Sequence, residues 1–283
     1  MDNLKAFLDV RKMLANFLQE DIGAGDITSD NIIPAELAAK AEVLSKSRFA
    51  VVCGLEEASL LFDICGCKSE ILVKEGSKVA KGTVVMNVSG SARAILKAER
   101  TVLNIIMRMS GIATETRRMV DVAKGVTILA TRKTAPGLRY FDKKAVVMGG
   151  GATHRMRLDD MVLIKDNHLA LLSDLGRCIR LARKNVGSSI KVECEARTKE
   201  EALAIIAAEA DAVMLDNFTP RQAQQTIRQI TRMGLRNKVK IELSGGINQK
   251  NIRHYSRAKP DFISLGYITH SSEAVDFSLE ITK

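Results

Sequence analysis

Charged side chains follow short apolar runs along the second half of the chain. The run TILATRKTAPGLR, residues 127–139, is apolar at first and then places the cations Arg132 and Lys133 side by side. Five later runs also end in charged residues or glycines. In chain order these ends carry Lys165, Glu195, Asp216, the group Ser244, Gly245 and Gly246, and finally Gly266. One charge after a strand is commonly a solvated loop residue, but six such ends in series predict a shared site.

The cations of this series predict a substrate with several negative charges. They are Arg132, Lys133, Arg139, Arg155 and Lys165, with His154 beside them in GGGATHRMRLDD. Cations that crowd together repel one another and lower one another's pKa unless an anion binds among them. The planar guanidinium of arginine suits carboxylates and phosphates because it donates two parallel hydrogen bonds. We therefore expect a polyanionic small molecule at these positions.

The two carboxylates of the series, Glu195 and Asp216, have two possible uses. They could form ion pairs with neighbouring lysines, or they could bind ribose hydroxyls and hold Mg²⁺ through water, since magnesium prefers oxygen ligands. The glycines of LSGGIN, residues 243–248, permit a phosphate to approach the backbone closely. His168 in IKDNH could cap a helix or join the site, and His254 is typical of a surface helix. No catalytic triad, activated cysteine or His/Cys metal cluster stands out, so the pattern indicates electrostatic positioning of anions.

Six strand-like runs alternate with helix-like segments in this half of the chain. The runs are VTILAT, MVLIK, IKVECE, AVMLD, VKIEL and FISLG, and segments such as TKEEALAIIAAEA lie between most of them. This alternation is typical of parallel strands covered by helices. In a β/α barrel the carboxyl ends of the strands converge on one mouth, which is where barrel enzymes hold their active sites. Six strands are fewer than the eight of a closed barrel, so either AVVMGGG, near residue 148, contains another strand or the barrel is incomplete.

The first part of the chain predicts a smaller domain and a long helix. Apolar residues recur at helical spacing over residues 4–18, and the segment EDIGAGDITSD that follows is turn-like. Its GAGD piece lacks the preceding strand that a nucleotide-phosphate loop needs. Short strand-like runs over residues 40–90 indicate a small mixed α/β domain. Residues 95–120 predict a long connecting helix, on which Arg100 is typical of a solvated cation.

Composition narrows the class of protein. With 283 residues, 46% of them apolar, the chain can bury a sizeable core. Residues 100–184 hold 17 Lys and Arg against 7 Asp and Glu, a surplus of ten that equals the net charge of +10 of the whole chain. Nucleic-acid-binding proteins usually add aromatic stacking platforms, but this chain has no Trp and only 4% aromatic residues. A small polyanion is therefore a better expectation than a nucleic acid.

Cysteines and apolar runs bear on the cellular location. The five cysteines, Cys53, Cys65, Cys67, Cys178 and Cys194, are odd in number and form no CxxC pair. Neither a disulfide framework nor a zinc knuckle is expected, and we interpret them as small buried residues. No apolar run approaches the roughly 20 residues of a membrane span, and the start MDNLKAFLDVRKML does not resemble a secretory leader. We expect a cytoplasmic protein that does not enter a membrane.

The motifs taken together resemble those of quinolinate phosphoribosyltransferase. The motifs EDIGAGDIT, ERTVLNIIMRMSGIAT, TRKTAPGLR, GGGATHRM, MVLIKDNH, VECEA, VMLDNFTP, ELSGGIN and SLGYITHS follow one another in that family's order over nearly the whole chain. The resemblance implies an incomplete, seven-stranded parallel α/β barrel of the type II phosphoribosyltransferase kind, with an N-terminal α/β open-sandwich domain. We expect the sandwich at residues 1–110, joined by the C-terminal segment 269–283, and the barrel with the active site at residues 111–268.

The resemblance also implies roles for residues that match the family's motifs. It places the two carboxylates of quinolinate against Arg100, Thr131, Arg132, His154, Arg155 and Lys165. It places phosphoribosyl pyrophosphate against Lys133, Glu195 and Asp216, the expected catalytic residues, with Mg²⁺ held by the two carboxylates through water. It assigns the 5′-phosphate to Ser244, Gly245, Gly246 and Gly266, flanked by Leu265 and Tyr267.

The implied reaction transfers the phosphoribosyl group to the pyridine nitrogen of quinolinate and releases pyrophosphate. Loss of the 2-carboxylate as CO₂ then gives nicotinate mononucleotide, a step of NAD biosynthesis. Glu195 and Asp216 would stabilise an oxocarbenium-like ribosyl centre, and Lys133 would offset the charge of the leaving group. The family forms homodimers or higher homo-oligomers, which implies that Arg100 reaches the neighbouring active site instead of remaining solvated.

Several positions depart from the family pattern and keep alternatives open. Ala130 stands where the family usually has Asp, Thr153 where it has Asn, and Tyr267 where Ala is frequent, and RLDD replaces GLYD. Molybdenum-transport accessory proteins of the same superfamily share an ATTRKT-like segment but lack IKDNH. Two further hypotheses are a polyanion- or nucleic-acid-binding barrel, whose binding would fall steeply with salt, and a structural subunit with an inactive site.

Overall fold

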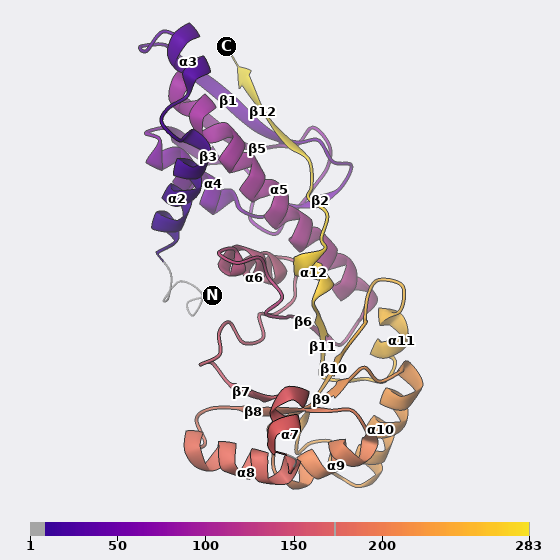
Figure 1. Ribbon diagram of the computed structural model, residues 1–283. Helices are drawn as coiled ribbons and strands as arrows, with labels where there is room; N and C mark the ends of the chain where they lie inside the picture. The colour runs from indigo at the N-terminus through magenta and orange to yellow at the C-terminus, as the bar shows by residue number, and fades with distance from the viewer. Residues whose placement is uncertain (1–8, 173, 283) are drawn as a thin grey trace. The chain divides into compact units, whose positions relative to one another are not determined.

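The computed structural model describes residues 9–172 and 174–282, and the chain divides into two compact units (Figure 1). The first unit combines the chain up to Glu115 with Tyr140–Gly149 and the segment from Ser271 onward. The second unit combines Thr116–Arg139 with Gly150–His270. Each unit is therefore built from segments that are far apart in the sequence.

The first unit contains a four-stranded antiparallel sheet in the order β12, β1, β5 and β3. Its strands are β1 Ala38–Ser45, β3 Lys68–Ile71, β5 Val84–Ser91 and β12 Phe277–Thr282. The yellow C-terminal strand β12 lies beside β1 in Figure 1, and the two pair from Lys40↔Thr282 to Ser45↔Phe277. A short ladder joins β2 Ala50–Val51 to β4 Lys78–Val79. The end of the chain thus completes a sheet that the N-terminal part begins.

Three helices near the N-terminus accompany this sheet, namely α2 Val10–Ile22, α3 Ile27–Ile32 and α4 Leu55–Ile64. Helix α2 confirms the helical spacing over residues 10–18, whereas residues 4–8 of that prediction lie outside the described residues. The turn-like interpretation of EDIGAGDITSD is wrong for its last residues. Asp26 accepts a hydrogen bond from the Ser29 N–H at 3.0 Å and so caps α3, because a carboxylate satisfies an amide that the first helical turn leaves unpaired.

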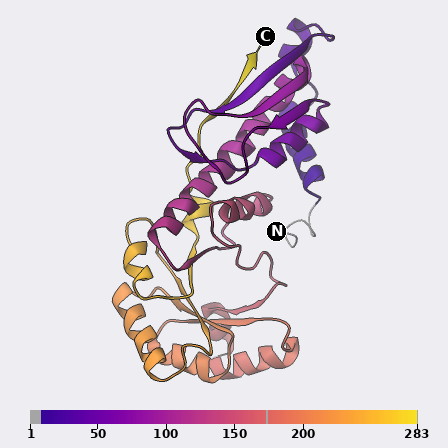
Figure 2. The same ribbon diagram turned by 180° about the vertical axis from the view of Figure 1, so that it is seen from behind.

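Helix α5, Ala92–Val122, confirms the predicted long helix and extends it at both ends. Figure 2 shows it running beside the strands of the antiparallel sheet. Its residues up to Glu115 belong to the first unit, and Arg100 is exposed on this part. In the part of the chain that the structure describes, no helix is long and apolar enough to cross a membrane.

Helix α6, Arg139–Met148, decides between the two alternatives for the segment AVVMGGG, because it excludes a strand over AVVM. The residues AVVM form the last turn of this helix. The seventh strand position is instead represented by Ala152, which forms an isolated parallel bridge with Leu129. The Ala152 N–H donates to the Ile128 carbonyl at 2.8 Å, and the Ala130 N–H donates to the Ala152 carbonyl at 2.9 Å. One bridge is too short to count as a strand, so the barrel is incomplete.

Long-range ion pairs hold α6 within the first unit. The Arg108 guanidinium donates Nε and Nη2 to the two oxygens of buried Asp142 at 2.8 and 2.9 Å. Lys144 Nζ lies 2.7 Å from a carboxylate oxygen of Glu56 and 2.8 Å from one of Glu57. The chain enters α6 from the segment TRKTAPGLR and leaves it into GGGATHR. Both segments are therefore continuous with a helix that belongs to the first unit.

The second unit contains a six-stranded parallel sheet that confirms all six predicted strands. They are β6 Thr127–Ala130, β7 Val162–Ile164, β8 Val192–Ala196, β9 Ala212–Asp216, β10 Lys240–Ser244 and β11 Phe262–Leu265. Their order is β6, β11, β10, β9, β8 and β7, with parallel pairing throughout. All six carboxyl ends therefore lie at the same edge of the sheet, as the alternation of strands and helices predicts.

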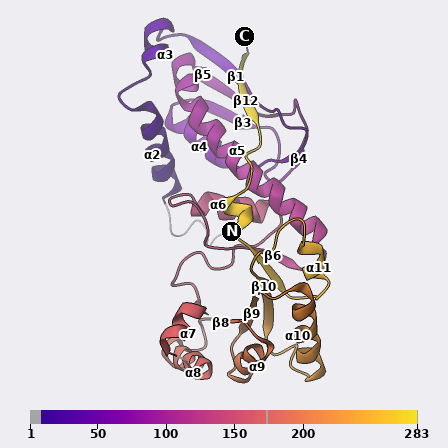
Figure 3. The same ribbon diagram turned by 45° about the vertical axis from the view of Figure 1, so that its right-hand side comes forward.

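The helices between and after these strands are α7 Asp166–Leu172, α8 Leu175–Val186, α9 Lys199–Ala207, α10 Pro220–Arg232, α11 Ile252–Ser256 and α12 Tyr267–His270. Helix α8 packs on β7 and β8, and α9 packs on β8 and β9. Figure 3 shows α8, α9 and α10 side by side along the outside of the strands. Apolar residues such as Val213 and Ile241 alternate with Met214 and Glu242 along the strands, and successive side chains point to opposite faces. The face opposite the helices is therefore the one that carries polar side chains.

Candidate active site

The carboxyl ends of the six strands surround a cavity of about 790 Å³, which we call the mouth pocket. Its lining includes the predicted residues Thr131, Arg132, Lys133, His154, Arg155, Lys165, Glu195, Asp216, Ser244, Gly245, Gly246, Gly266 and Tyr267. Three predicted residues are absent from this lining. Leu265 is buried in the core, Arg100 belongs to the first unit, and Arg139 contacts loop residues as described below. The structure thus brings the residues at the strand ends into one cavity.

Arg132 and Lys133 follow strand β6 in a turn whose backbone is held by hydrogen bonds. The Lys133 N–H donates to Thr131 Oγ1 at 3.0 Å, and Thr269 Oγ1 donates to the Lys133 carbonyl at 2.8 Å. Arg132 Nε is buried and has no hydrogen-bond partner among the described residues. Since a buried, unpaired guanidinium N–H is costly, this donor is prepared for an anionic acceptor from outside the chain.

Lys165 and Glu195 form an ion pair across the ends of β7 and β8. Glu195 also accepts the Asp166 N–H at 3.4 Å, and only 9% of its side chain is exposed. The sequence left open whether His168 caps a helix or joins the site. In the structure, His168 Nδ1 accepts the Lys165 N–H at 2.9 Å, so this exposed ring fixes the backbone of the lysine and does not line the pocket. His254 is exposed on α11, as expected.

Asp216 is oriented by the residue that follows it. Asn217 Nδ2 donates to Asp216 Oδ2 at 2.6 Å, and the Asn217 N–H donates to the Ser244 carbonyl at 2.9 Å. Asn217 has a φ of +57°, a left-handed conformation that few residues other than glycine adopt. A Cβ atom on Gly245, whose φ is +94°, would lie 2.2 Å from Asn217 Oδ1. Position 245 therefore needs glycine so that the ends of β9 and β10 can approach closely.

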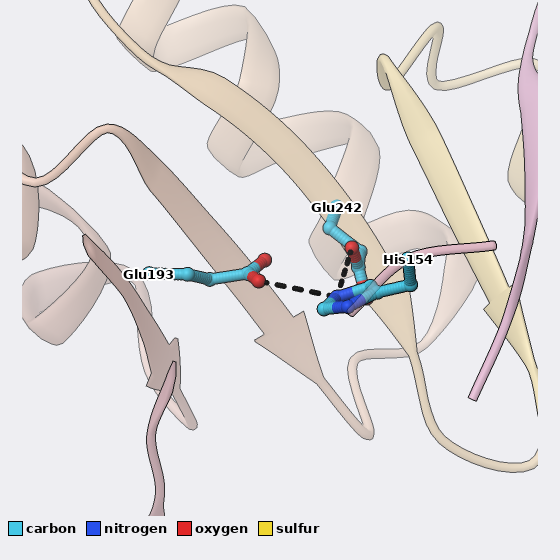
Figure 4. Close-up of side chains that lie close together, drawn as sticks. All are labelled: His154, Glu193 and Glu242. Atoms are coloured by element: carbon cyan, nitrogen blue, oxygen red, sulfur yellow. Dashed lines mark ion pairs between the residues drawn. The ribbon is translucent and has the colours of Figure 1, made fainter. Parts of the chain in front are cut away.

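Three ionisable side chains, His154, Glu193 and Glu242, lie close together (Figure 4), and two of them, His154 and Glu242, line the mouth pocket. His154 Nε2 is 3.3 Å from Glu193 Oε2 and 3.4 Å from Glu242 Oε2, and at most 9% of each side chain is exposed. We call these residues the floor trio, because His154 and Glu242 line both the mouth pocket and a second cavity of about 980 Å³. That second cavity includes the strand starts, where its cations Lys191 and Lys240 are already paired with Asp211 and Asp261.

The three side chains of the floor trio shift one another's pKa. Burial, followed by the charge of Glu242, raises the pKa of Glu193 to about 7. Burial lowers the pKa of His154, but hydrogen bonds and charges from the two carboxylates outweigh it and raise it to about 9. His154 Nδ1, however, accepts the Arg155 N–H at 2.6 Å, which opposes a second proton on the ring. Nε2 is therefore the ring nitrogen whose proton faces the two carboxylates.

This geometry does not fit a metal ion at the floor trio, although three possible ligand atoms lie within 4.8 Å of one another. A metal on Nε2 normally requires a proton on Nδ1, so that the imidazole stays neutral. Nδ1 of His154 instead accepts a hydrogen bond, which leaves the ring proton on Nε2. Glu195 and Asp216 are better suited to a hard cation such as Mg²⁺, because both offer carboxylate oxygens to the mouth pocket.

Arg155 and Arg139, two cations of the predicted set, have different surroundings. The Arg155 side chain lies in the mouth pocket, and burial, followed by the charge of Arg132, lowers its pKa. Arg139 instead donates to Thr134 Oγ1 and to the Met156 carbonyl, each at 3.3 Å, and does not line the pocket. Arg139 therefore shapes the loops of the site and is not part of its wall.

Sequence reasoning missed a layer of side chains directly below the predicted ones. Glu193, Met214, Glu242 and Ser264 each lie two positions before a predicted strand-end residue. Since side chains alternate between the faces of a strand, residues at i and i−2 point to the same face, and this period could have identified them. Asn217 gave no comparable signal, because its left-handed backbone is visible only in the structure.

Comparison with protein-family models matches nearly the whole chain to one family. Residues 26–110 match the model described as "Quinolinate phosphoribosyl transferase, N-terminal domain". Residues 112–280 match the corresponding C-terminal domain. Together the two models cover both units.

Curated proteins and solved structures agree with this match. A probable nicotinate-nucleotide pyrophosphorylase [carboxylating] of Methanocaldococcus jannaschii is 41% identical over 278 residues, which cover 96% of this chain and 97% of that protein. One of Bacillus subtilis is 39% identical over 279 residues and covers 97% and 94%. The structure of the nicotinate-nucleotide pyrophosphorylase from Francisella tularensis superposes with a TM-score of 0.89 at 34% identity and covers 96% of both chains.

Proposed function

This chain belongs to the quinolinate phosphoribosyltransferase family, and we propose that it converts quinolinate and phosphoribosyl pyrophosphate into nicotinate mononucleotide, pyrophosphate and CO₂. One observation from the structure carries the proposal. The mouth pocket holds Arg132, whose buried Nε has no partner among the described residues, together with the cations Lys133, Arg155 and Lys165. A pocket of this kind suits a substrate pair that brings carboxylates, phosphates and a pyrophosphate.

The quinolinate end of the pocket is the part near β6 and β7. Arg132, Arg155 and Lys165 would bind the two carboxylates of the pyridine ring, with Thr131 and His154 completing the wall. The lowered pKa of Arg155 supports this assignment, because the repulsion from Arg132 that contributes to it would be relieved by a bound dianion. Lys165 is paired with Glu195 in the structure, so quinolinate would compete with that carboxylate for the lysine.

The phosphoribosyl end of the pocket is formed by the ends of β8, β9, β10 and β11, and Lys133 extends over Gly266 from the turn after β6. Lys133 would meet the pyrophosphate, and Ser244, Gly245, Gly246 and Gly266 would hold the 5′-phosphate, flanked by Leu265 and Tyr267. Glu195 and Asp216 would contact the ribose and hold Mg²⁺ through water. When bound, Mg²⁺ would offset negative charge on the pyrophosphate.

The chemistry follows from where these charges stand. As the bond from ribose to pyrophosphate breaks, positive charge develops on the ribosyl centre and negative charge on the leaving group. Glu195 and Asp216 would stabilise the former, and Lys133 would stabilise the latter. Once the pyridine nitrogen is ribosylated and positively charged, it can accept the electron pair that remains when the 2-carboxylate leaves as CO₂.

The proposal extends to assembly and location. We propose a homodimer or higher homo-oligomer in which exposed Arg100 on α5 reaches the quinolinate of a neighbouring subunit. A cytoplasmic location is supported by five cysteines that are all free of disulfides. The proposal includes no nucleic-acid or membrane partner. The division into a domain of residues 1–110 with 269–283 and a barrel of 111–268 is likewise proposed.

Product analysis tests the proposed function directly. Purified protein is incubated with quinolinate, phosphoribosyl pyrophosphate and Mg²⁺, and the products are identified by mass spectrometry beside a Lys133→Ala variant. We expect nicotinate mononucleotide and CO₂ from the unmutated protein and a loss of at least about a hundredfold in the variant, as is typical when a charge-stabilising group is removed. Folded protein that forms no product would contradict the proposal and favour the molybdenum-transport accessory class, whose acceptor would be another anion.

A further inference from the structure

The ring of His154 has no free nitrogen for a substrate. Nδ1 accepts the Arg155 N–H at 2.6 Å, and Nε2 faces the carboxylates of Glu193 and Glu242 at 3.3 and 3.4 Å (Figure 4). Because Nδ1 is an acceptor, Nε2 carries the ring proton and donates it toward the two carboxylates. His154 lines the mouth pocket, but its polar atoms are directed to other groups of the protein.

The backbone around His154 is strained and firmly held. Its φ of +49° is unusual for a residue other than glycine, so the surroundings must impose it. Two residues earlier, Ala152 is fixed to β6 through its N–H and its carbonyl. One residue later, the Arg155 N–H is fixed by the His154 ring. Hydrogen bonds therefore hold the turn on both sides of His154, and the bond from the Arg155 N–H depends on how the His154 ring is oriented.

The two carboxylates that orient the ring come from different strands. Glu193 belongs to β8 and Glu242 to β10, and both side chains are 2% exposed. Glu242 is oriented in turn by a hydrogen bond that its Oε1 accepts from Ser264 Oγ. Glu193 Oε1 is buried and has no hydrogen-bond partner among the described residues. A carboxylate in that position is expensive to keep, which indicates a function beyond packing.

We propose that Glu193 and Glu242 are positioning residues for the quinolinate site. They hold the His154 ring, the ring fixes the Arg155 amide, and the amide fixes where the Arg155 guanidinium enters the mouth pocket. The inference rests on the proposed function and assigns His154 to the support of Arg155 instead of to direct contact with quinolinate.

Glutamine variants test this chain of contacts. In Glu242→Gln, the amide oxygen can keep the hydrogen bond from Ser264, so the amide NH₂ faces the Nε2 proton of His154. Two donors then oppose each other, and the ring can no longer keep its position. Glu193→Gln removes the other charged acceptor. We expect each variant to weaken quinolinate binding, measured by titration calorimetry, by about tenfold or more, because hydrogen bonds to charged groups contribute on that scale.

Matched controls separate positioning from general damage. Quinolinate binding should weaken more than the KM for phosphoribosyl pyrophosphate changes in both variants. Glu195 and Ser244 end the same strands, but the two glutamates contact His154 and Ser264. Glu200→Gln, an exposed residue of α9 with a side chain 75% exposed, should leave both substrates unaffected. Rescue should be partial in Glu193→Asp, which keeps the charge at a shorter reach.

The outcomes distinguish this inference from the proposed function. If the unmutated protein makes nicotinate mononucleotide and both folded glutamine variants bind quinolinate as tightly as it does, the inference alone fails. If the unmutated protein neither binds quinolinate nor forms product, the proposed function fails and the inference fails with it. Should the variants not fold, nitrogen NMR of the unmutated protein decides, because the chain has only four histidines to assign. A His154 ring with its proton on Nε2 would support the inference, and a proton on Nδ1 would overturn it.

Discussion

Gly266 has no side chain, and this leaves the space that the Lys133 side chain occupies. A Cβ atom there would lie 2.9 Å from Lys133 Cδ and 3.4 Å from the ring of His270, so the lysine side chain runs over this glycine. Gly266→Ala should therefore displace Lys133. We expect kcat to fall by about a hundredfold, because displacements of about 1 Å of a catalytic group have effects of that size. Gly176→Ala, in helix α8, is the matched control and should not change kcat, so equal rates in the two variants would contradict the prediction.

Asn217 combines a strained backbone with a side-chain hydrogen bond to Asp216, and two substitutions separate these effects. Asn217→Gly removes the hydrogen bond but accepts the φ of +57° without strain. Asn217→Ala removes the same bond and adds a strain of about 1 kcal/mol to the folded state. Both variants should lower kcat/KM for phosphoribosyl pyrophosphate by about tenfold, and only the alanine variant should lower the free energy of unfolding in denaturant titration. Full activity of the glycine variant would show that Asp216 does not depend on this neighbour.

At the scale of elements, two strands of the barrel begin with the same arrangement. Asp211 precedes β9 and accepts the Val192 N–H at 2.8 Å, and Asp261 precedes β11 and accepts the Ile241 N–H at 2.9 Å. Each aspartate also pairs with a lysine and an arginine, namely Lys191 and Arg183 for Asp211, and Lys240 and Arg236 for Asp261. Burial opposes the shift, but these contacts lower the pKa of both carboxyl groups below the ordinary 3.8. The arrangement fixes the register of neighbouring parallel strands.

Neutralising these aspartates should destabilise the barrel. Asp211→Asn and Asp261→Asn should each lower the free energy of unfolding at pH 7 by about 1–3 kcal/mol, the range for charged hydrogen bonds. Because the folded-state pKa lies below the unfolded one, the stabilisation is present above pH 3.8 and is lost as the pH falls through the folded value. The difference from the unmutated protein should therefore shrink in acid, as followed by urea unfolding at several pH values. Exposed Asp159→Asn is the control, and a difference that grows in acid would contradict the prediction.

The elements differ in how far their sequences reveal them. The six barrel strands are recognisable because they are continuous apolar runs, and their ends are recognisable because charged residues and glycines interrupt those runs. Helix α6 is different, because its buried Lys143 and Lys144 are typical of a surface loop until their surroundings are known. Lys144 meets Glu56 and Glu57, which lie almost ninety residues earlier in the sequence. A pattern read over a few turns cannot detect such a partner.

The same limit applies to the active site. The strand-end residues follow from topology alone, since parallel strands must bring their carboxyl ends to one edge. To predict the floor trio, one must also know that Glu193 and Glu242 point toward His154, which lies in a loop. The sequence pattern does not reveal this orientation. The resemblance of the motifs predicts that His154 contacts the substrate, and the structure adds that its ring nitrogens face Arg155 and the two glutamates.

For the whole molecule, the charge surplus of residues 100–184 has more than one explanation. Arg108 and Lys144 neutralise buried carboxylates in the first unit, and Arg183 neutralises Asp211 in the second. Other cations of the segment, such as Arg132 and Lys165, line the mouth pocket. The surplus is thus divided between structural ion pairs and one cavity, which argues against the hypothesis of a surface built to bind a long polyanion.

In the proposed oligomer, each active site uses residues of two subunits, and this can be tested by mixing variants. If exposed Arg100 completes a neighbour's quinolinate site, Arg100→Ala and Lys133→Ala impair different halves of a shared site. Co-expression of the two inactive variants should then restore about a quarter of the unmutated activity, because half of the dimers are mixed and one of their two sites is intact. Lys133→Ala with Asp216→Ala is the control, since both residues line the same subunit's pocket, and it should restore nothing. Recovery in neither mixture would mean that Arg100 acts within its own subunit or not at all.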